Sequence, residues 1–119
     1  MVYLVGGYIL TYEQVYAFAN HNHFEIPGIE GITLCPNRWL RSQGVPFRLL
    51  AVSYKGHPHV ILVTRARHRS GETKDTFTPY LERPEDKVVK DKMAEWDGRL
   101  VDAEFGTVAN PYGTPQWTS

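Results

Sequence analysis

The longest apolar stretch of the chain runs from Phe47 to Ala66 and reads FRLLAVSYKGHPHVILVTRA. It contains two runs rich in Val, Ile, Leu and aromatic residues, separated by Lys55-Gly56-His57-Pro58. Two such runs on either side of a segment with Gly and Pro are typical of a β-hairpin. We therefore expect a hairpin with a four-residue loop at the centre of the fold.

A loop of this length fixes which residues lie opposite each other. It pairs Tyr54 with His59 near the turn and Arg48 with Arg65 at the far end. Side chains alternate between the two faces of a strand, so these pairs share one face and the intervening residues share the other. The second face is almost wholly apolar and is predicted to meet the core. Its members are Phe47, Leu49, Ala51, Ser53, Val60, Leu62, Thr64 and Ala66.

Two helices are predicted outside the hairpin. Thr11 and Gln14 form a capping-box pattern, and apolar residues at helical spacing follow, which predicts a helix over about 12–21. Pro84 precedes two acidic residues and a second apolar stripe. Proline at the first position and acids in the first turn favour a helix, here over about 84–97.

Shorter patterns predict further elements in the first half of the chain. Residues 2–9 read as a strand interrupted by Gly6-Gly7, and glycine inside a strand often marks a bulge or a close approach of another segment. A short strand is predicted at 32–35. Asn37 is expected to cap one or two helical turns over 38–43.

Two segments in the second half of the chain show no clear pattern of a helix or a strand. Residues 67–83 are polar and punctuated, which predicts a mobile loop, and such long connections are often functional. A last strand is predicted within 100–108. Residues 109–119 form an uncharged tail that contains Tyr112 and Trp117.

Together these elements predict an α+β fold. A small, mainly antiparallel sheet is centred on the 47–66 hairpin, and the two main helices pack on one side of it. The 119 residues are enough for one domain, 1–119, with a single core.

Composition indicates the cellular compartment of the protein. No apolar run is long enough to cross a membrane, and the N-terminus lacks the pattern of a secretory signal. The one cysteine, Cys35, excludes an internal disulfide and fits a reducing compartment, so we expect a soluble, cytoplasmic protein. Its apolar neighbours favour a buried structural cysteine over a catalytic nucleophile.

Charge is unevenly distributed, although the net charge is zero. Residues 1–34 carry a net charge of −3, residues 35–74 carry +7 and residues 75–119 carry −4. The basic middle either pairs with the acidic flanks, for example with Glu85 or Asp86, or forms a patch for an anionic partner.

The basic end of the hairpin is the first candidate site. Arg is suited to bidentate binding of phosphate or carboxylate, and an aromatic side chain can stack on a ligand. The predicted ligand-binding residues are Arg48, Arg65, Arg67, Arg69 and Tyr54. They predict a non-catalytic binding module for an anionic ligand or a protein partner. Nucleic acid is a weaker possibility, because the chain has no standard nucleic-acid motif and no net positive charge.

The alternative function is a small enzyme with a histidine-lined pocket. Two His-x-His patterns can each present two imidazoles on one side of an extended chain, as a metal site requires. The alternative metal ligands are His21, His23, His57 and His59. Neither paired cysteines nor a carboxylate at diagnostic spacing accompanies them, so no metal or other cofactor is expected. A third possibility is a homodimer formed through exposed hairpin edges and the uncharged tail with Tyr112 and Trp117.

Overall fold

The computed structural model describes residues 2–69 and 77–110, with side chains described for 4–67 and 77–109. It confirms the α+β prediction, because helices pack against a four-stranded antiparallel sheet with strand order β2-β3-β1-β4. The elements are β1 (Val2–Leu10), α1 (Tyr12–His21), the 3₁₀ helix η1 (Ile29–Gly31), α2 (Leu34–Ser42), β2 (Arg48–Tyr54), β3 (His57–Arg69), α3 (Pro84–Trp96), the 3₁₀ helix η2 (Gly98–Asp102) and β4 (Glu104–Asn110).

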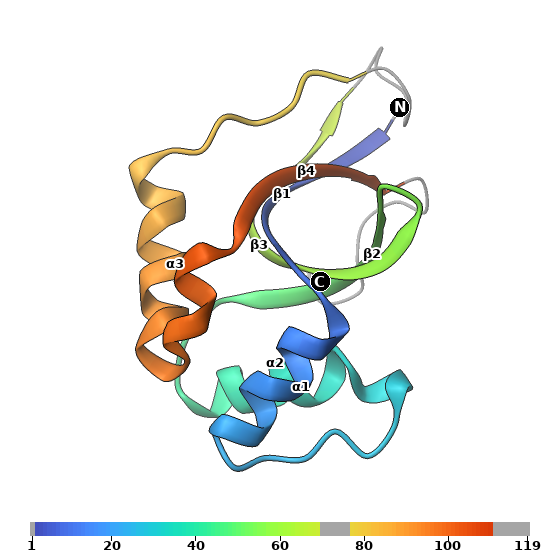
Figure 1. The fold of residues 1–119 in the computed structure, drawn as a ribbon. Coiled ribbons are helices and arrows are strands. Elements are labelled where there is room, and N and C mark those ends of the chain that lie inside the picture. Colours follow the sequence, from blue (N-terminus) through green and yellow to red (C-terminus); the bar gives the residue numbers. More distant parts are fainter. Residues whose placement is uncertain (1, 70–76, 111–119) are drawn as a thin grey trace.

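The sheet is strongly curled, with the helices outside the curl (Figure 1). Gly7 of β1 lies opposite Gly106 of β4 on the concave face, so the two central positions carry no side chain there. A Cβ at Gly106 would lie 3.5 Å from a ring carbon of Tyr54 in β2. The Tyr54 hydroxyl donates to Glu104 Oε1 at 3.3 Å, so the two edge strands of the sheet touch each other at this point.

The main core lies between the convex face of the sheet and the helices. Leu49, Leu62 and Tyr8 are neighbours on three adjacent strands, and all are fully buried. The helices add Val15, Phe18, Leu40 and Met93. This agrees with the predicted core face of the hairpin, although Ala51 of that face is exposed.

The concave face holds a second, smaller cluster. Its buried members are Val5, Ile9, Ile61 and Val108. The curl encloses apolar side chains that a flat sheet would leave in water. For this reason both faces of the hairpin are apolar in the sequence.

The predicted four-residue loop and its register are wrong. The hairpin turns on only two residues, Lys55 and Gly56, whose φ angles are 52° and 80°. Positive φ at both central residues is the geometry of a type I′ turn, which matches the twist of the strands. Tyr54 therefore pairs with His57. The register differs by two residues from the prediction, so every side chain before residue 64 stays on its predicted face.

A bulge in β3 also separates residues that we expected to be opposed. Gly6 pairs with Arg65 but Gly7 pairs with Val63, so Thr64 is an extra residue. One extra residue moves all later side chains to the other face. Arg65 therefore lies on the convex face. Arg48 pairs with Val63, and the predicted Arg48–Arg65 opposition is wrong.

Helix α2 replaces the strand predicted at 32–35 and extends the short turn predicted at 38–43. Pro36 lies in its first turn, where a helix tolerates proline. Asn37 does not cap this helix, because its side chain hydrogen-bonds to the backbone of Leu49.

The other predicted boundaries of helices and strands lie closer to those of the structure. The helices predicted over 12–21 and 84–97 are confirmed as α1 and α3. Residues 67–69, expected in the loop, end β3, and β4 begins at Glu104 after η2. Residues 70–76 of the predicted loop, and residues 111–119 of the predicted tail, lie outside the described residues. No described helix is long and apolar enough to cross a membrane.

Candidate binding surface around Arg67 and Tyr80

Tyr80 brings two arginines of β3 together. Its ring lies against Gly6, where a Cβ would come within 2.5 Å of the ring, so glycine is needed at this position. The guanidinium carbon of Arg65 lies 4.6 Å from the ring centroid, and that of Arg67 lies 5.0 Å from it. Cations over an aromatic ring are attracted by its quadrupole. The Thr64 bulge makes this arrangement possible, because it turns both arginines to the convex face.

Arg65 is neutralised within the fold. Its Nη2 donates to Asp86 Oδ2 at 3.0 Å, and also to the carbonyl oxygen of Leu81. Asp86 is only 2% exposed and also accepts a hydrogen bond from the backbone of Arg83 at 2.8 Å. The pairing with the acidic flank considered from the sequence is therefore found for Arg65.

Arg67 differs from Arg65 in its surroundings. Its side chain is exposed. No acidic group among the described residues lies within 4.0 Å of its guanidinium, whereas Arg65 and Arg99 both form ion pairs. Its described contact is the Tyr80 ring. Arg67 thus lies over the Tyr80 ring and forms no ion pair with a described acidic residue.

Residues 77–83 hold Tyr80 in place. The Tyr80 backbone donates to Thr107 Oγ1 at 2.8 Å, and the buried Tyr8 hydroxyl donates to Glu82 Oε2 at 2.6 Å. Burial, together with the Glu82 hydrogen bond, raises the pKa of Tyr8 above its ordinary value, so the hydroxyl stays protonated. These contacts tie the segment to β1 and β4.

The other predicted ligand-binding residues lie elsewhere. Arg48 is half-buried, lies on the concave side of the sheet and donates to the backbone oxygen of Phe47. Tyr54 lies at the opposite end of β2, beside Lys55 and Glu104. The Arg69 side chain lies outside the described residues. The structure therefore brings together Arg65 and Arg67 of the predicted set and adds Tyr80, which is not among the predicted residues.

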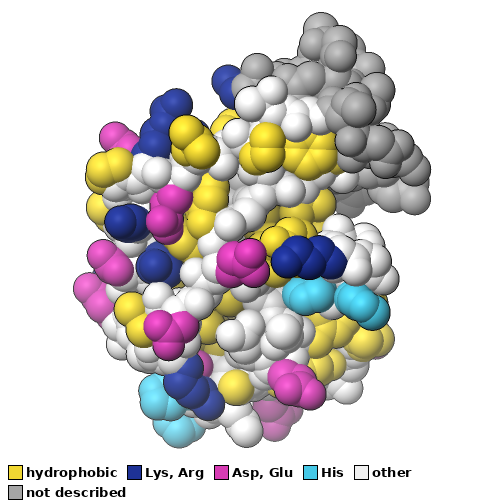
Figure 2. Space-filling view, turned by 45° about the horizontal axis from the view of Figure 1, so that its top comes forward, with side chains coloured by type: hydrophobic (Ala, Val, Ile, Leu, Met, Phe, Trp, Pro, Cys, Tyr) yellow, Lys and Arg dark blue, Asp and Glu magenta, His cyan; other side chains and the backbone are white. Residues whose placement is uncertain are grey.

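The histidines do not form one site. Figure 2 shows histidine side chains in two separate groups on the surface, as expected from a helix end and a hairpin turn. His59 Nδ1 lies 3.0 Å from the backbone oxygen of His57, so this pair already makes a local contact. Among the described residues, no group of three or more His, Cys, Asp or Glu side chains is placed to hold a metal ion.

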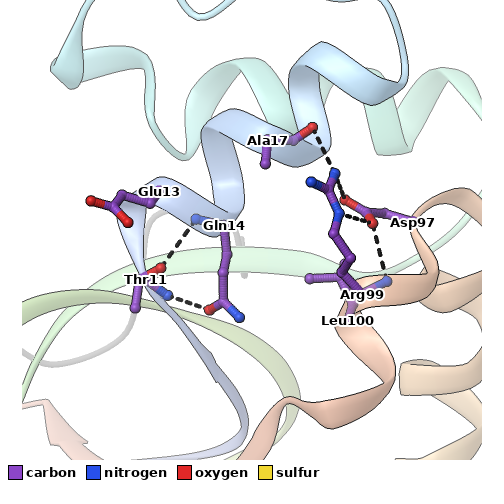
Figure 3. Close-up of a pocket in the computed structure, with 7 residues that line it drawn as sticks. All are labelled: Thr11, Glu13, Gln14, Ala17, Asp97, Arg99 and Leu100. Carbon is purple, nitrogen blue, oxygen red and sulfur yellow. Dashed lines mark hydrogen bonds and ion pairs between the residues drawn. The ribbon is translucent and has the colours of Figure 1, made fainter.

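A groove of about 170 Å³ lies between the start of α1 and η2 (Figure 3). Its lining residues are Thr11, Glu13, Gln14, Ala17, Asp97, Arg99 and Leu100. Arg99 donates to both carboxylate oxygens of Asp97 at 2.8 Å and to the backbone oxygen of Ala17. These hydrogen bonds hold the pKa of Asp97 below its ordinary value. The groove contains neither histidine nor cysteine, and its polar groups bond mainly to one another.

Comparison of the chain with models of known protein families, with curated proteins and with solved structures finds no match. A function for the chain is therefore inferred from its own residues and their surroundings.

Proposed function

We propose that the chain is a non-catalytic binding protein that takes an anionic group of a partner on Arg67, with Tyr80 as its support. The observation that carries the proposal is the exposed Arg67 guanidinium, stacked on Tyr80 and without an acidic partner among the described residues. Guanidinium donors match the geometry of carboxylate and phosphate groups.

The surroundings of Arg67 favour the binding of an anionic group. Stacking on Tyr80 restricts the guanidinium before any ligand arrives, which lowers the entropy lost on binding. Tyr80 is itself fixed by its backbone hydrogen bond to Thr107 and by its fit against Gly6. Arg65 also lies over the Tyr80 ring, and Asp86 balances its charge.

A protein partner with an acidic or phosphorylated segment fits this surface better than nucleic acid does. The net charge of the chain is zero, whereas strong nucleic-acid binding requires many phosphate contacts. One stacked arginine can bind one carboxylate or phosphate group. A cytoplasmic location, predicted from the single cysteine, is compatible with such a partner and stays a prediction.

The enzyme alternative has less support. The groove beside α1 is lined by none of the histidines that this alternative requires. No hydrogen bond joins Cys35 to a histidine in the described part of the chain.

A binding titration at two salt concentrations tests the proposal. The probes are a fluorescent Glu-rich peptide and its phosphoserine-containing counterpart. Arg67→Gln is expected to weaken binding about fivefold, the effect of roughly 1 kcal/mol for an exposed charge contact. Arg41→Gln is the matched control, since Arg41 is also exposed and the substitution removes the same charge. Equal weakening by both variants, or no binding by the wild type, would overturn the proposal.

A further inference from the structure

The outer edge of β2 is partly covered by one side chain. Asn37 of α2 donates from Nδ2 to the Leu49 backbone oxygen at 2.9 Å, and its Oδ1 accepts from the Leu49 backbone nitrogen at 2.7 Å. A neighbouring strand would make the same two hydrogen bonds to a residue of the sheet edge. Asn37 therefore occupies the first position at which an added strand could pair.

The next two outward positions follow from the alternation of the strand. Leu49 directs both backbone groups away from β3, so Ala51 and Ser53 must do the same. Pro58 lies opposite Ser53, and its missing N–H costs no hydrogen bond to β2 at such a position. The backbone N–H and C=O groups of Ala51 and Ser53 thus form a row along the outer edge.

This row is open in the described part of the structure. Ala51 and Ser53 are both exposed, and no described residue forms a hydrogen bond with their outward groups. One end of the open stretch lies at Leu49, where Asn37 occupies the backbone groups. The other end lies at Tyr54, which contacts Glu104 of β4. An open strand edge is a template for pairing with an extended chain.

We propose that the Ala51–Ser53 edge of β2 binds an extended acidic segment of a partner protein as an added strand. The charge of the flanking residues favours an acidic partner, because the basic residues Arg48 and Lys55 lie at the start of β2 and directly after its end; the acidic Glu104 accepts a hydrogen bond from Tyr54. Antiparallel pairing of two copies would place Lys55 of one chain beside Arg48 of the other, and such like-charge contacts are unfavourable. The edge is separate from Arg67 and binds independently of it.

Amide hydrogen exchange followed by NMR gives a direct readout. In the free protein the amides of Ala51 and Ser53 are expected to exchange rapidly, whereas those of Leu50 and Val52, which point to β3, are protected. The probe is a short peptide of alternating Glu and Val with blocked ends. At saturating peptide, exchange at Ala51 and Ser53 should slow at least about tenfold, and a Lys/Val peptide of equal length should have little effect.

Backbone substitutions make the test specific for the edge. Ser53→Pro removes the outward N–H and should abolish the effect of the peptide, whereas Ser53→Ala keeps the N–H and should retain it. If Ser53→Pro does not fold, N-methylation of alternate peptide amides provides the same test on the wild-type protein. Arg67→Gln should leave edge binding unchanged, which distinguishes a failure of this proposal from a failure of the Arg67 surface.

Three results would overturn the proposal. The first is unchanged exchange at Ala51 and Ser53 with the acidic peptide. The second is equal protection by the Lys/Val peptide, which would mean that charge does not select the partner. The third is protection that rises with protein concentration in the absence of peptide, because this would identify a second copy of the chain as the occupant.

Discussion

Asp86, at the start of α3, accepts a hydrogen bond from Arg65 of β3 at 3.0 Å, across 21 positions of the sequence. The acid is almost completely buried, and the arginine side chain is 21% exposed. The same carboxylate oxygen accepts from the Arg83 backbone, so one atom joins the sheet to the first turn of the helix. A helix N-terminus also favours a negative charge.

Loss of this carboxylate is expected to destabilise the fold. Asp86→Ala would leave Arg65 without its ion pair and remove the hydrogen bond to Arg83. We expect the free energy of unfolding to fall by about 2–3 kcal/mol, less than for a fully buried pair because Arg65 is partly exposed. Urea denaturation measures the change. Asp91→Ala, an exposed acid of the same helix, is the control, and equal effects of the two substitutions would contradict the assigned role of Asp86.

Truncation of Leu62 tests the convex core. Leu62 is buried among residues of β1, β2 and the helices, so Leu62→Ala should reduce the free energy of unfolding by about 2–5 kcal/mol. Val88→Ala on α3 is the control, because Val88 is 66% exposed and its loss should change stability by less than about 0.5 kcal/mol. An unchanged melting temperature for Leu62→Ala would show that the convex face is not the main core.

The contact between Gly6 and Tyr80 predicts coupling between distant parts of the chain. Gly6→Ala places a Cβ against the Tyr80 ring and should cost about 1–3 kcal/mol, the usual range for overpacking. Gly98→Ala is the control, because a Cβ there has no neighbour within 4 Å.

A double-mutant cycle isolates that coupling. The cost of Gly6→Ala should be smaller when Tyr80 is already alanine, because the clash is then absent. Additive costs in chemical denaturation would mean that Tyr80 does not pack on Gly6 in solution.

The ion pair in the groove predicts a pH dependence. Because the folded-state pKa of Asp97 is depressed, its contribution to stability is present above the unfolded pKa of about 3.9 and is lost as the pH falls through the lower folded pKa. Asp97→Asn should therefore reduce stability at pH 7 and flatten its fall in the acidic range. Urea unfolding at a series of pH values measures both effects, and a parallel pH profile for the variant would contradict the assignment.

Local patterns predicted part of the fold correctly. The Thr11–Gln14 capping box is present as expected, because both of its hydrogen bonds join residues three positions apart. Gly6-Gly7 did mark a close approach, but the approaching ring belongs to Tyr80, and no local pattern identifies so distant a partner. The first turn of helix α2 was missed because proline in a first turn resembles a helix breaker when the helix start is not known.

The candidate surface was only partly predictable for a related reason. The sequence identified the arginines, but their grouping depends on the bulge at Thr64, which pairing with β1 creates. Without the bulge Arg65 and Arg67 would point to the concave side. The length of the hairpin turn was also ambiguous, since Lys55-Gly56 and Lys55-Gly56-His57-Pro58 are both plausible turns and differ in register by two residues.

The Thr64 bulge divides β3 into two parts with opposite rules for substitution. Before it, odd-numbered residues such as Ile61 face the apolar interior of the curl; after it, Arg65 and Arg67 carry charge and face Tyr80. Deleting one residue here would exchange the environments of Arg65 and Ala66 without altering either side chain. Related sequences should therefore tolerate changes of residue type along β3 more readily than changes in its length.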